Sequence, residues 1–463
     1  MKNLFLLLLG IFLGWEGPSL GATFLPLSSP LYDSLSFLEA KGCLPSAILD
    51  TRPLSRREVF RLLEEASFCP QSFPLKEFHL NRLREYLAYE PELSFFRPLD
   101  GLKLQGFYLA RAPRTGRLPL YFKRGRSLRR GLRNEFFFFS RLEGERFSFF
   151  LAPRLKFEGG KTKTSMEEGY LAATLGPFTL LAGRLSQHWG PQERSPLLLS
   201  ENPRPFKLLL LTNESPFLLE DLGLLRLTFF VTRLGSQRAV PHPYLWGLKV
   251  VLKPRPGLEL SASRTALLGG KGRDNSLKTW LKSLLGLKEN LGQKGKEVGD
   301  QRFSLGLKLI RPKDLPFTLY FSLGREHLVE NILREWATGA GLYLPTFLRE
   351  DLSLRLEFLH TPSNWNLHYL YRSGYTYQGR GIGTHIFGKG HLWYGKLSKQ
   401  WPSLGLETEV QLELAKDHFR GRDETYTLEV RRLSKRKVFS LALGLRRYQG
   451  RSLPLFKLSL TLR

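Results

Sequence analysis

The chain has 463 residues, with 70 Lys and Arg against 42 Asp and Glu and a formal net charge of +28. No stretch reaches the ~18 uninterrupted apolar residues of a spanning helix, which argues against a helical membrane protein. The charge indicates a polyanionic neighbour, namely nucleic acid, anionic lipid headgroups or an acidic polysaccharide, or else a basic excess spread over loops and lipid-proximal rims.

The first residues have the composition of an export signal. Lys2 precedes an apolar run from Leu4 to Leu13, and small residues near Ala22 suit a signal peptidase. That run is about half the length of a spanning helix, so we expect residues 1–22 to be a cleaved signal peptide. Export makes nucleic acid the weakest of the three polyanions, and we expect no nucleic-acid partner.

The chain has two cysteines, Cys43 and Cys69. A disulfide is permitted in an exported protein, and closing a loop of this size would stabilise the fold by roughly 3 kcal/mol on the entropic argument. The alternative is that both residues are small buried hydrophobic side chains.

Residues 23–95 are expected to form a small helical domain. Pro30 can occupy a first helical position, and Ser55 with Glu58 forms a capping-box pattern at the start of a second helix. A third helix is expected over Leu75–Leu87.

From about residue 96 the hydrophobic period changes from 3.6 to 2, and it stays there to the last residue. Roughly 360 residues of this repeat, at about 20 residues per strand and turn, leave room for about 16–18 strands. We therefore expect residues 96–463 to form an all-β transmembrane barrel of antiparallel strands, with a large soluble β-protein as the alternative. Tyr108, Tyr121 and Phe122 lie near strand ends and suit interfacial girdles.

Three carboxylates, Glu407, Glu409 and Glu413, share one face of a predicted strand. Leaving them unpaired in a narrow lumen would be costly. We expect arginines of neighbouring strands, such as Arg431 or Arg355, to face them. The lumen would then be packed and ionic rather than an open pore.

The segment 183–206, GRLSQHWGPQERSPLLLSENPRPF, is too irregular for a plain strand. An indole can stack on the apolar face of a sugar, the polar side chains can bind hydroxyl or carboxylate groups, and the prolines reduce the ordering cost of binding. The candidate polysaccharide-binding residues are Arg184, Gln187, His188, Trp189, Glu201, Asn202 and Arg204. The alternative is that the segment folds inward as a plug and turns the chain without touching a ligand.

A second irregular segment, GYTYQGRGIG, runs from Gly374 to Gly383. Its glycines permit close backbone approach or positive φ. Its candidate polysaccharide-binding residues are Tyr375, Tyr377, Gln378 and Arg380. Alternatively, the arginine forms a lumen ion pair and the tyrosines belong to a barrel girdle.

Together, the GR…WGP…LLLS-N-PF pattern of the first segment, the second segment, and TRPLSRRE at Thr51–Glu58 resemble the Wzi-type capsule assembly family. The resemblance implies an 18-stranded outer-membrane barrel with a periplasmic helical domain, acting as a lectin for capsular polysaccharide. The chain departs from the family pattern at Gln192 and Glu193, where a glycine is usual soon after WGP. It also ends on Arg463, whereas outer-membrane barrels commonly end on an aromatic residue.

We therefore predict a non-enzymatic outer-membrane protein that binds and retains surface or capsular polysaccharide, with a sugar-selective diffusion porin as the alternative. Its other expected partners are outer-membrane lipids and the barrel assembly machinery. Ser186 and His188 share a strand face but lack a nucleophile signature, so a hydrolase is not favoured. The scattered histidines offer no metal-ligand spacing, and we expect neither metal nor cofactor.

Overall fold

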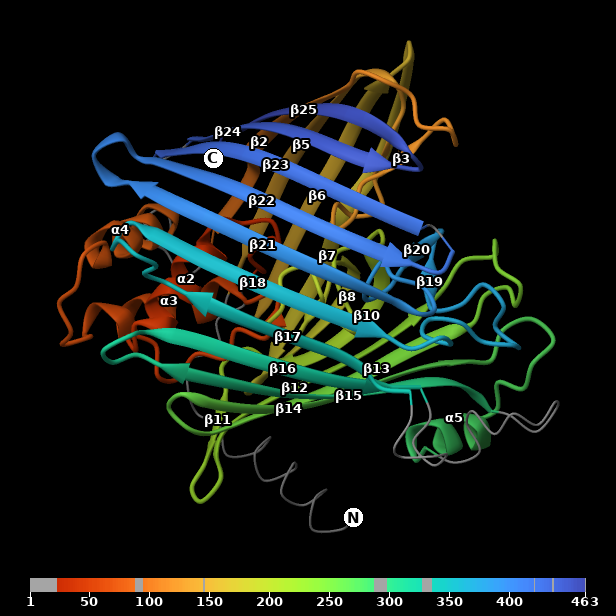
Figure 1. The fold of residues 1–463 in the computed structure, drawn as a ribbon. Helices are drawn as coiled ribbons and strands as arrows, with labels where there is room; N and C mark the ends of the chain where they lie inside the picture. The colour runs from red at the N-terminus through yellow and green to blue at the C-terminus, as the bar shows by residue number, and fades with distance from the viewer. Residues whose placement is uncertain are drawn as a thin grey trace.

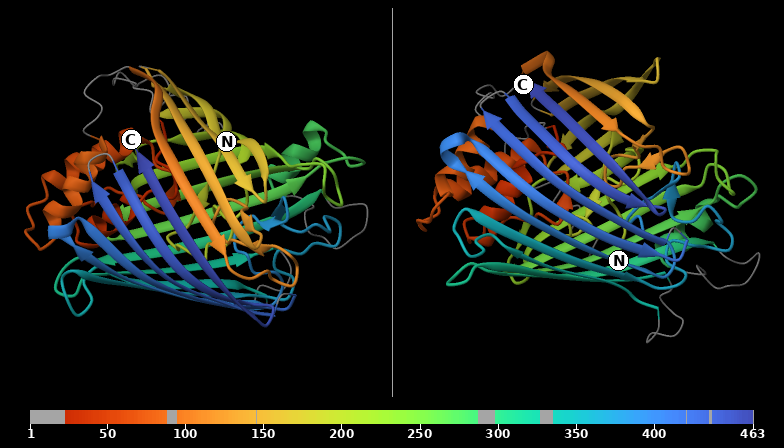
Figure 2. Two further views of the ribbon diagram at one scale, coloured as in Figure 1. Left: turned by 90° about the horizontal axis from the view of Figure 1, so that it is seen from above. Right: turned by 45° about the horizontal axis from the view of Figure 1, so that its top comes forward.

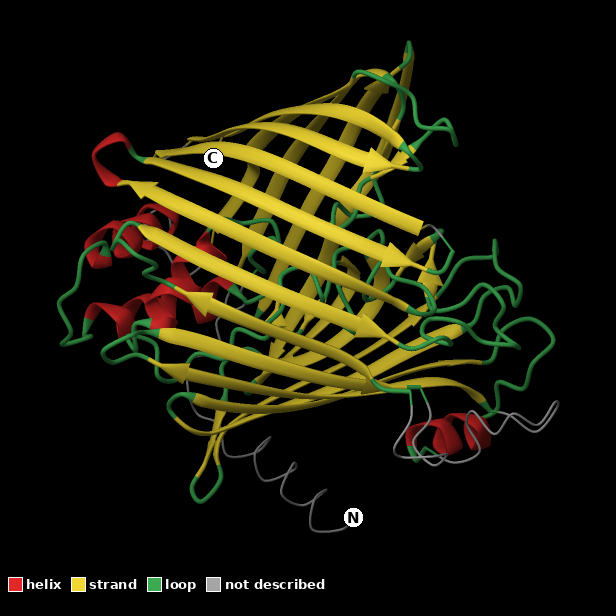
Figure 3. Ribbon diagram, in the orientation of Figure 1, coloured by secondary structure: helices red, strands yellow, loops and turns green. Residues whose placement is uncertain are grey.

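The computed structural model describes residues 23–87, 95–144, 146–286, 298–326, 335–419, 421–434 and 437–462. Within these ranges, three helices precede a closed β-barrel (Figures 1 and 3). No helix in the described part of the chain combines the length and apolar character needed to cross a membrane. The expected signal peptide lies outside the described residues.

The N-terminal helices are α2 (Leu31–Ala40), α3 (Arg56–Ser67) and α4 (Lys76–Leu87). Pro30 is the N-cap of α2, one position before the expected one, and Ser55 Oγ accepts a hydrogen bond from Glu58 N at 3.1 Å at the start of α3. The Glu58 carboxylate of the expected capping box accepts hydrogen bonds from Arg61 and Ser215. Leucines and alanines of the three helices form one apolar core.

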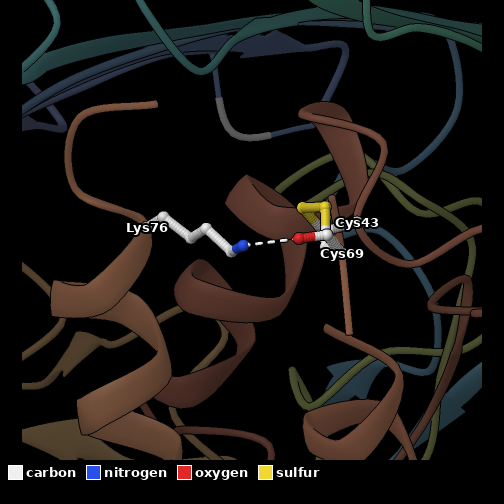
Figure 4. Close-up of a disulfide and its surroundings, with 3 residues drawn as sticks. All are labelled: Cys43, Cys69 and Lys76. Atoms are coloured by element: carbon white, nitrogen blue, oxygen red, sulfur yellow. Dashed lines mark hydrogen bonds between the residues drawn. A yellow bond between two sulfur atoms is a disulfide. The ribbon is translucent and has the colours of Figure 1, made fainter. Parts of the chain in front are cut away.

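The two cysteines form a disulfide that joins the segments after α2 and α3. The Cα atoms of Cys43 and Cys69 are 5.1 Å apart, and Lys76 Nζ donates a hydrogen bond to the Cys69 carbonyl at 2.6 Å (Figure 4). Of the two alternatives left open by the sequence, the disulfide is the correct one.

Eighteen antiparallel strands in the described part of the chain close the barrel, and β2 seals it by pairing with β25. This confirms the upper end of the expected strand number. In chain order the strands are β2 (Phe95–Leu109), β5 (Gly131–Glu143), β6 (Phe147–Glu158), β7 (Lys161–Leu175), β8 (Phe178–Leu185), β10 (Phe206–Asn213), β12 (Gly223–Arg233), β13 (Tyr244–Arg255), β14 (Leu258–Leu268), β15 (Gly299–Arg311), β16 (Phe317–Arg325), β17 (Ala337–Leu344), β18 (Leu352–Thr361), β21 (Gly390–Trp401), β22 (Leu406–Asp417), β23 (Gly421–Ser434), β24 (Lys437–Tyr448) and β25 (Arg451–Leu462).

Several short elements lie outside the main barrel wall. β11 (Phe217–Leu219) extends the hairpin into β12. The remaining ones are β1 (Thr51–Arg52), β3 (Leu118–Pro119), β4 (Ser127–Leu128), β9 (His188–Trp189), β19 (Thr376–Tyr377), β20 (Arg380–Gly381), α5 (Leu277–Leu284) and the 3₁₀ turn η1 (Pro402–Leu404).

The outer face of the barrel is apolar. On β10, Leu208 and Leu210 point into the lumen, whereas Leu209 between them is 57 % exposed on the outside. Exposed leucines, phenylalanines and tryptophans recur on the other strands, as a transmembrane barrel requires. Tyr108 is exposed on this face, but the girdle prediction is wrong for Tyr121 and Phe122, which are buried in the lumen.

The two rims of the barrel differ. Helices α2–α4 lie at one rim, where connections such as 176–177 and 256–257 are short turns (Figure 2). The long connections, such as 110–130, 186–205 and 362–389, all lie at the opposite rim. We call these rims the helical end and the loop end.

Ion pairs attach the helical domain to the inner wall of the barrel, and all of their side chains except that of Asp33 are buried. The pairs are Asp33–Lys396 at 3.2 Å, Glu39–Lys308 at 2.6 Å, Asp50–Lys249 at 3.1 Å and Arg82–Glu407 at 3.2 Å. Arg431 also contacts Glu407 and Glu409 at 3.2 and 3.4 Å, as predicted. The prediction for Arg355 is wrong, because its Nε lies 3.4 Å from Glu193 instead.

Candidate functional site: three loops in the barrel lumen

The first irregular segment enters the lumen directly after β8. Just before this point, Gly183 lets β8 pack closely against β7, because a Cβ there would lie 2.4 Å from both Gly169 O and Tyr170 Cα. Trp189 N then donates to Leu199 O at 3.0 Å and closes the segment into a compact loop.

The same segment is tied to the helical domain. β9 pairs with β1 in a two-stranded sheet, with Trp189 opposite Thr51 and His188 opposite Arg52. Gly190 N continues the contact by donating to Asp50 O at 2.7 Å. The N-terminal domain therefore supplies one strand of the loop structure inside the barrel.

The second irregular segment forms a tight hairpin. β19 and β20 pair through Tyr377 and Arg380, and the two residues between them, Gln378 and Gly379, have φ of 49° and 75°. Two successive positive φ values belong to a type I′ turn, which matches the twist of a two-residue hairpin. The glycine in this turn thus has the conformational role that the sequence indicated.

Asn202 joins the two segments to a third loop. Its Oδ1 accepts from Phe122 N at 3.2 Å, and its Nδ2 donates to Gly381 O at 3.0 Å. Its own carbonyl accepts from Gly125 N at 2.9 Å. Since the side chain is fully buried, Asn202 fixes the three loops relative to one another. We call residues 119–126, 186–205 and 374–383 together the plug.

The aromatic candidates form the interior of the plug. Trp189 is 3 % exposed and meets Phe230 edge-on, with ring centroids 5.5 Å apart. Tyr375 donates to Thr265 Oγ1 at 2.9 Å, and Tyr377 packs 5.0 Å from Phe206. These three rings stabilise the plug and present no open face on which a sugar could stack.

Gln187 and His188 are also buried. His188 Nε2 lies 2.7 Å from Gln192 O, and burial together with nearby Arg52 lowers the pKa of His188 to about 3. The imidazole is therefore neutral at pH 7 and adds no charge for an anionic ligand. Ser186 Oγ has no hydrogen-bond partner in the described part of the chain, so no Ser–His pair is assembled.

Arg184 lies apart from the other candidates. Alternation along β8 places Leu181 and Leu185 in the lumen cluster and Arg184 on the outer face, where it donates to Met166 O at 2.8 Å. Strand β8 includes the first three residues of the first segment, 183–185, and the alternation of this strand decides where the Arg184 side chain points.

Three candidates reach the surface of the plug at the loop end: Arg204, Gln378 and Arg380, which we call the arginine face. Arg204 and Gln378 are exposed, and Arg380 is half-buried. Arg380 Nη2 donates to Arg126 O at 3.0 Å, and Arg204 Cγ would lie 2.8 Å from a Cβ on Gly125. Both arginines therefore rest on the same short stretch of the third loop.

The third loop adds further cations that the sequence analysis did not single out. Residues 110–130 contain no Asp or Glu. The exposed arginines among them are Arg111, Arg114, Arg117, Arg129 and Arg130. The absence of carboxylates over this stretch was the signal available in the sequence.

The inner surface of the plug borders a cavity of about 480 Å³ that the helical domain closes on the other side. Lys103 and Lys123 line it, and no carboxylate in the described part of the chain lies within 4.0 Å of either. Burial, with neighbouring Lys457 and Arg194, lowers the pKa of Lys123 to about 8. Glu201 also faces this cavity, with its Oε2 3.8 Å from Arg124 Nε.

The sequence matches the family described as "Capsule assembly protein Wzi" over residues 104–446, well over half of the chain. The chain belongs to the capsule assembly protein Wzi family. No curated protein matches it.

Among solved structures, the fold is similar to that of Wzi from Escherichia coli, described as an outer membrane protein involved in group 1 capsule assembly and a carbohydrate-binding β-barrel. The two share 19 % identity with a TM-score of 0.75, and the match covers 95 % of this chain and 99 % of that chain. OccD3 of Pseudomonas aeruginosa matches with 12 % identity and a TM-score of 0.48 over 80 % of this chain and 92 % of its own. At these identities, the likeness to Wzi shows the fold alone.

The two residues at which the first segment departs from the expected Wzi family pattern both anchor the plug. Gln192 Nε2 donates to Ser322 Oγ on the barrel wall. Glu193 pairs with Lys396 at 2.7 Å and with Arg355 at 3.4 Å. Although burial opposes ionisation, these cations hold the pKa of Glu193 well below its usual range.

Proposed function

We propose that the protein is an outer-membrane, lectin-like protein that binds surface or capsular polysaccharide and retains it at the cell surface. The observation that carries the proposal is the arginine face: the guanidinium groups of Arg204 and Arg380 and the amide of Gln378, presented at the loop end by the plug in a member of the Wzi family. The E. coli relative is described as carbohydrate-binding and active in capsule assembly, which supports the same role here.

The orientation in the membrane follows from the rims. In outer-membrane barrels the short turns are periplasmic and the long loops are extracellular. The helical end, and with it the helical domain, then lies in the periplasm, and the arginine face points outward. Outer-membrane lipids surround the apolar wall, and the barrel assembly machinery inserts it.

The ligand class follows from the charge. Arginine forms bidentate hydrogen bonds with carboxylates, and such charge-assisted bonds are roughly twice as strong as neutral ones. We therefore assign an acidic polysaccharide to Arg204, Gln378 and Arg380. Asn202 and Trp189 position these residues from below without touching the polymer.

Binding of purified acidic capsular polysaccharide tests the assignment. The double variant Arg204→Ala, Arg380→Ala is expected to weaken binding at least tenfold, because each charge-assisted hydrogen bond contributes about 1.5–3 kcal/mol. Arg184→Ala removes one arginine from the outer face instead of from the arginine face and serves as the control, with binding unchanged. Equal binding by the double variant, with a normally assembled barrel, would contradict the proposal.

Polysaccharide retention without turnover is distinguished from a sugar-selective porin by conductance in planar bilayers. The plug spans the lumen through three loops fixed at one buried asparagine, so we expect no steady current through the wild-type protein. Sustained ion flow would favour the porin.

A further inference from the structure

Helix α5 lies outside the barrel, at the rim opposite α2–α4 (Figure 1). Side chains alternate between the two faces of a strand. Leu245 and Leu267 belong to the lumen cluster, so their neighbours Trp246 and Leu268 point outward. Both outward residues are nevertheless buried, because they pack in one cluster with Trp280 of α5.

The helix is held firmly on this wall. Trp246 Nε1 donates to Ser283 Oγ at 3.0 Å. Arg264 donates to Ser283 O at 2.7 Å and to Leu284 O at 3.0 Å, satisfying carbonyls that have no partner within the helix. At the other end, Ser276 Oγ accepts from Thr279 N as the N-cap. Together, these contacts fix the orientation of α5 on the barrel.

The face of α5 away from the barrel is a stripe of exposed leucines. Leu277, Leu281, Leu284 and Leu285 are 75 %, 50 %, 42 % and 65 % exposed. Their spacing of four, seven and eight residues puts them on one side of the helix. The next outward residue on β13 beyond Trp246 is Leu248, which belongs to the apolar outer wall and is 40 % exposed. The stripe thus continues the lipid-facing surface.

Two lysines border the stripe. Lys278 and Lys282 follow Leu277 and Leu281 directly, which places each about 100° around the helix from its leucine. In the described part of the chain, no carboxylate lies within 4.0 Å of either lysine. An apolar stripe with a basic flank is typical of helices that lie in the membrane interface.

We propose that α5 is an interfacial helix whose leucines enter the acyl layer of the outer leaflet and whose two lysines bind the phosphate groups of anionic lipids there. The proposal rests on the membrane orientation given above and is independent of where polysaccharide binds. The occupant is a lipid surface, because the stripe is continuous with the barrel wall and the flank carries the charge that complements phosphate.

The depth of the stripe can be measured on the full chain in vesicles. Both native cysteines are in a disulfide, so Leu281→Cys supplies a single thiol for an environment-sensitive fluorophore. Leu248→Cys is the lipid-facing control and Lys271→Cys, exposed on the same loop, is the aqueous control. We expect nitroxide lipids to quench labels at 281 and 248 and iodide to quench the label at 271. Equal iodide quenching at 281 and 271 would overturn the proposal.

The lysines are tested by comparing phosphatidylcholine vesicles with and without phosphatidylglycerol. The anionic lipid is expected to lower iodide quenching of the label at 281 about twofold, and Lys278→Gln with Lys282→Gln is expected to abolish that difference. No effect of the anionic lipid on the protein with native lysines would overturn the phosphate assignment. Polysaccharide binding measured on the same variants should not change, so failure of the proposed function would be recognised separately.

Discussion

The two ends of the lumen are closed in different ways. At the helical end, carboxylates of the helices meet lysines of the wall in buried ion pairs such as Glu39–Lys308 and Asp50–Lys249. At the loop end, the hydrogen bonds of Asn202, aromatic packing and the Glu193–Lys396 ion pair hold the plug, and Arg204 stays exposed at its surface. Charged groups that close the lumen are therefore neutralised inside the protein, whereas the guanidinium group of Arg204 lies at the surface of the plug, where a ligand can reach it.

The largest effect is expected from removing one partner of a buried ion pair at the helical end. Asp50→Ala leaves Lys249 buried without its carboxylate, and we expect a loss of about 3–5 kcal/mol in the free energy of unfolding. Denaturant unfolding followed by tryptophan fluorescence measures it. Asp314→Ala, which removes an exposed pair with Arg311, should change stability by less than about 1 kcal/mol. Similar losses in both variants would contradict the distinction.

At the loop end, Asn202→Ala is expected to affect the plug and not the attachment of the helical domain. The change removes the acceptor for Phe122 N and the donor to Gly381 O, and buried unsatisfied groups cost about 1–3 kcal/mol each. That amount is enough to release the three loops from one another, so we expect brief conductance openings in a planar bilayer. Gln378→Ala, on the exposed turn of the same plug, should remain silent.

The ion pairs at the helical end should make the attachment of the helical domain depend on pH. Burial works against ionisation of Asp33 and Asp50, but Lys396 and Lys249 outweigh it, so the pKa of each carboxyl lies below its usual value. Their contribution is present above about pH 4 and is lost as the pH falls through the folded-state pKa. Acid should therefore release the helical domain, which limited proteolysis across a pH series would detect.

Glu214 behaves in the opposite sense. Burial raises its pKa, although its contacts with Thr179 and Ser55 oppose that rise. A raised pKa favours the protonated form in the fold, so the ionised group destabilises the protein above its unfolded-state pKa. Glu214→Gln should raise the unfolding free energy at pH 7 and have little effect at pH 3. A destabilised variant at pH 7 would contradict this sign.

The periodic parts of the fold could be predicted from the sequence. The apolar alternation predicted the strands, and the Ser55 cap predicted the start of α3. It also marked both irregular segments, but it could not show that they meet, because Asn202 and Gly381 are 179 residues apart in the chain and come into hydrogen-bonding contact only when the barrel closes. Tyr121 and Phe122 were misplaced for the same reason: an aperiodic loop gives no sign of which face its aromatic residues take.

The two-residue ladder between β1 and β9 has a mechanical consequence. Because a strand from the amino-terminal bundle is hydrogen-bonded to the loop that supports the outer arginines, the two rims form one linked body. A periplasmic partner that displaces the helical domain would therefore also displace the loop that carries Arg204 of the arginine face.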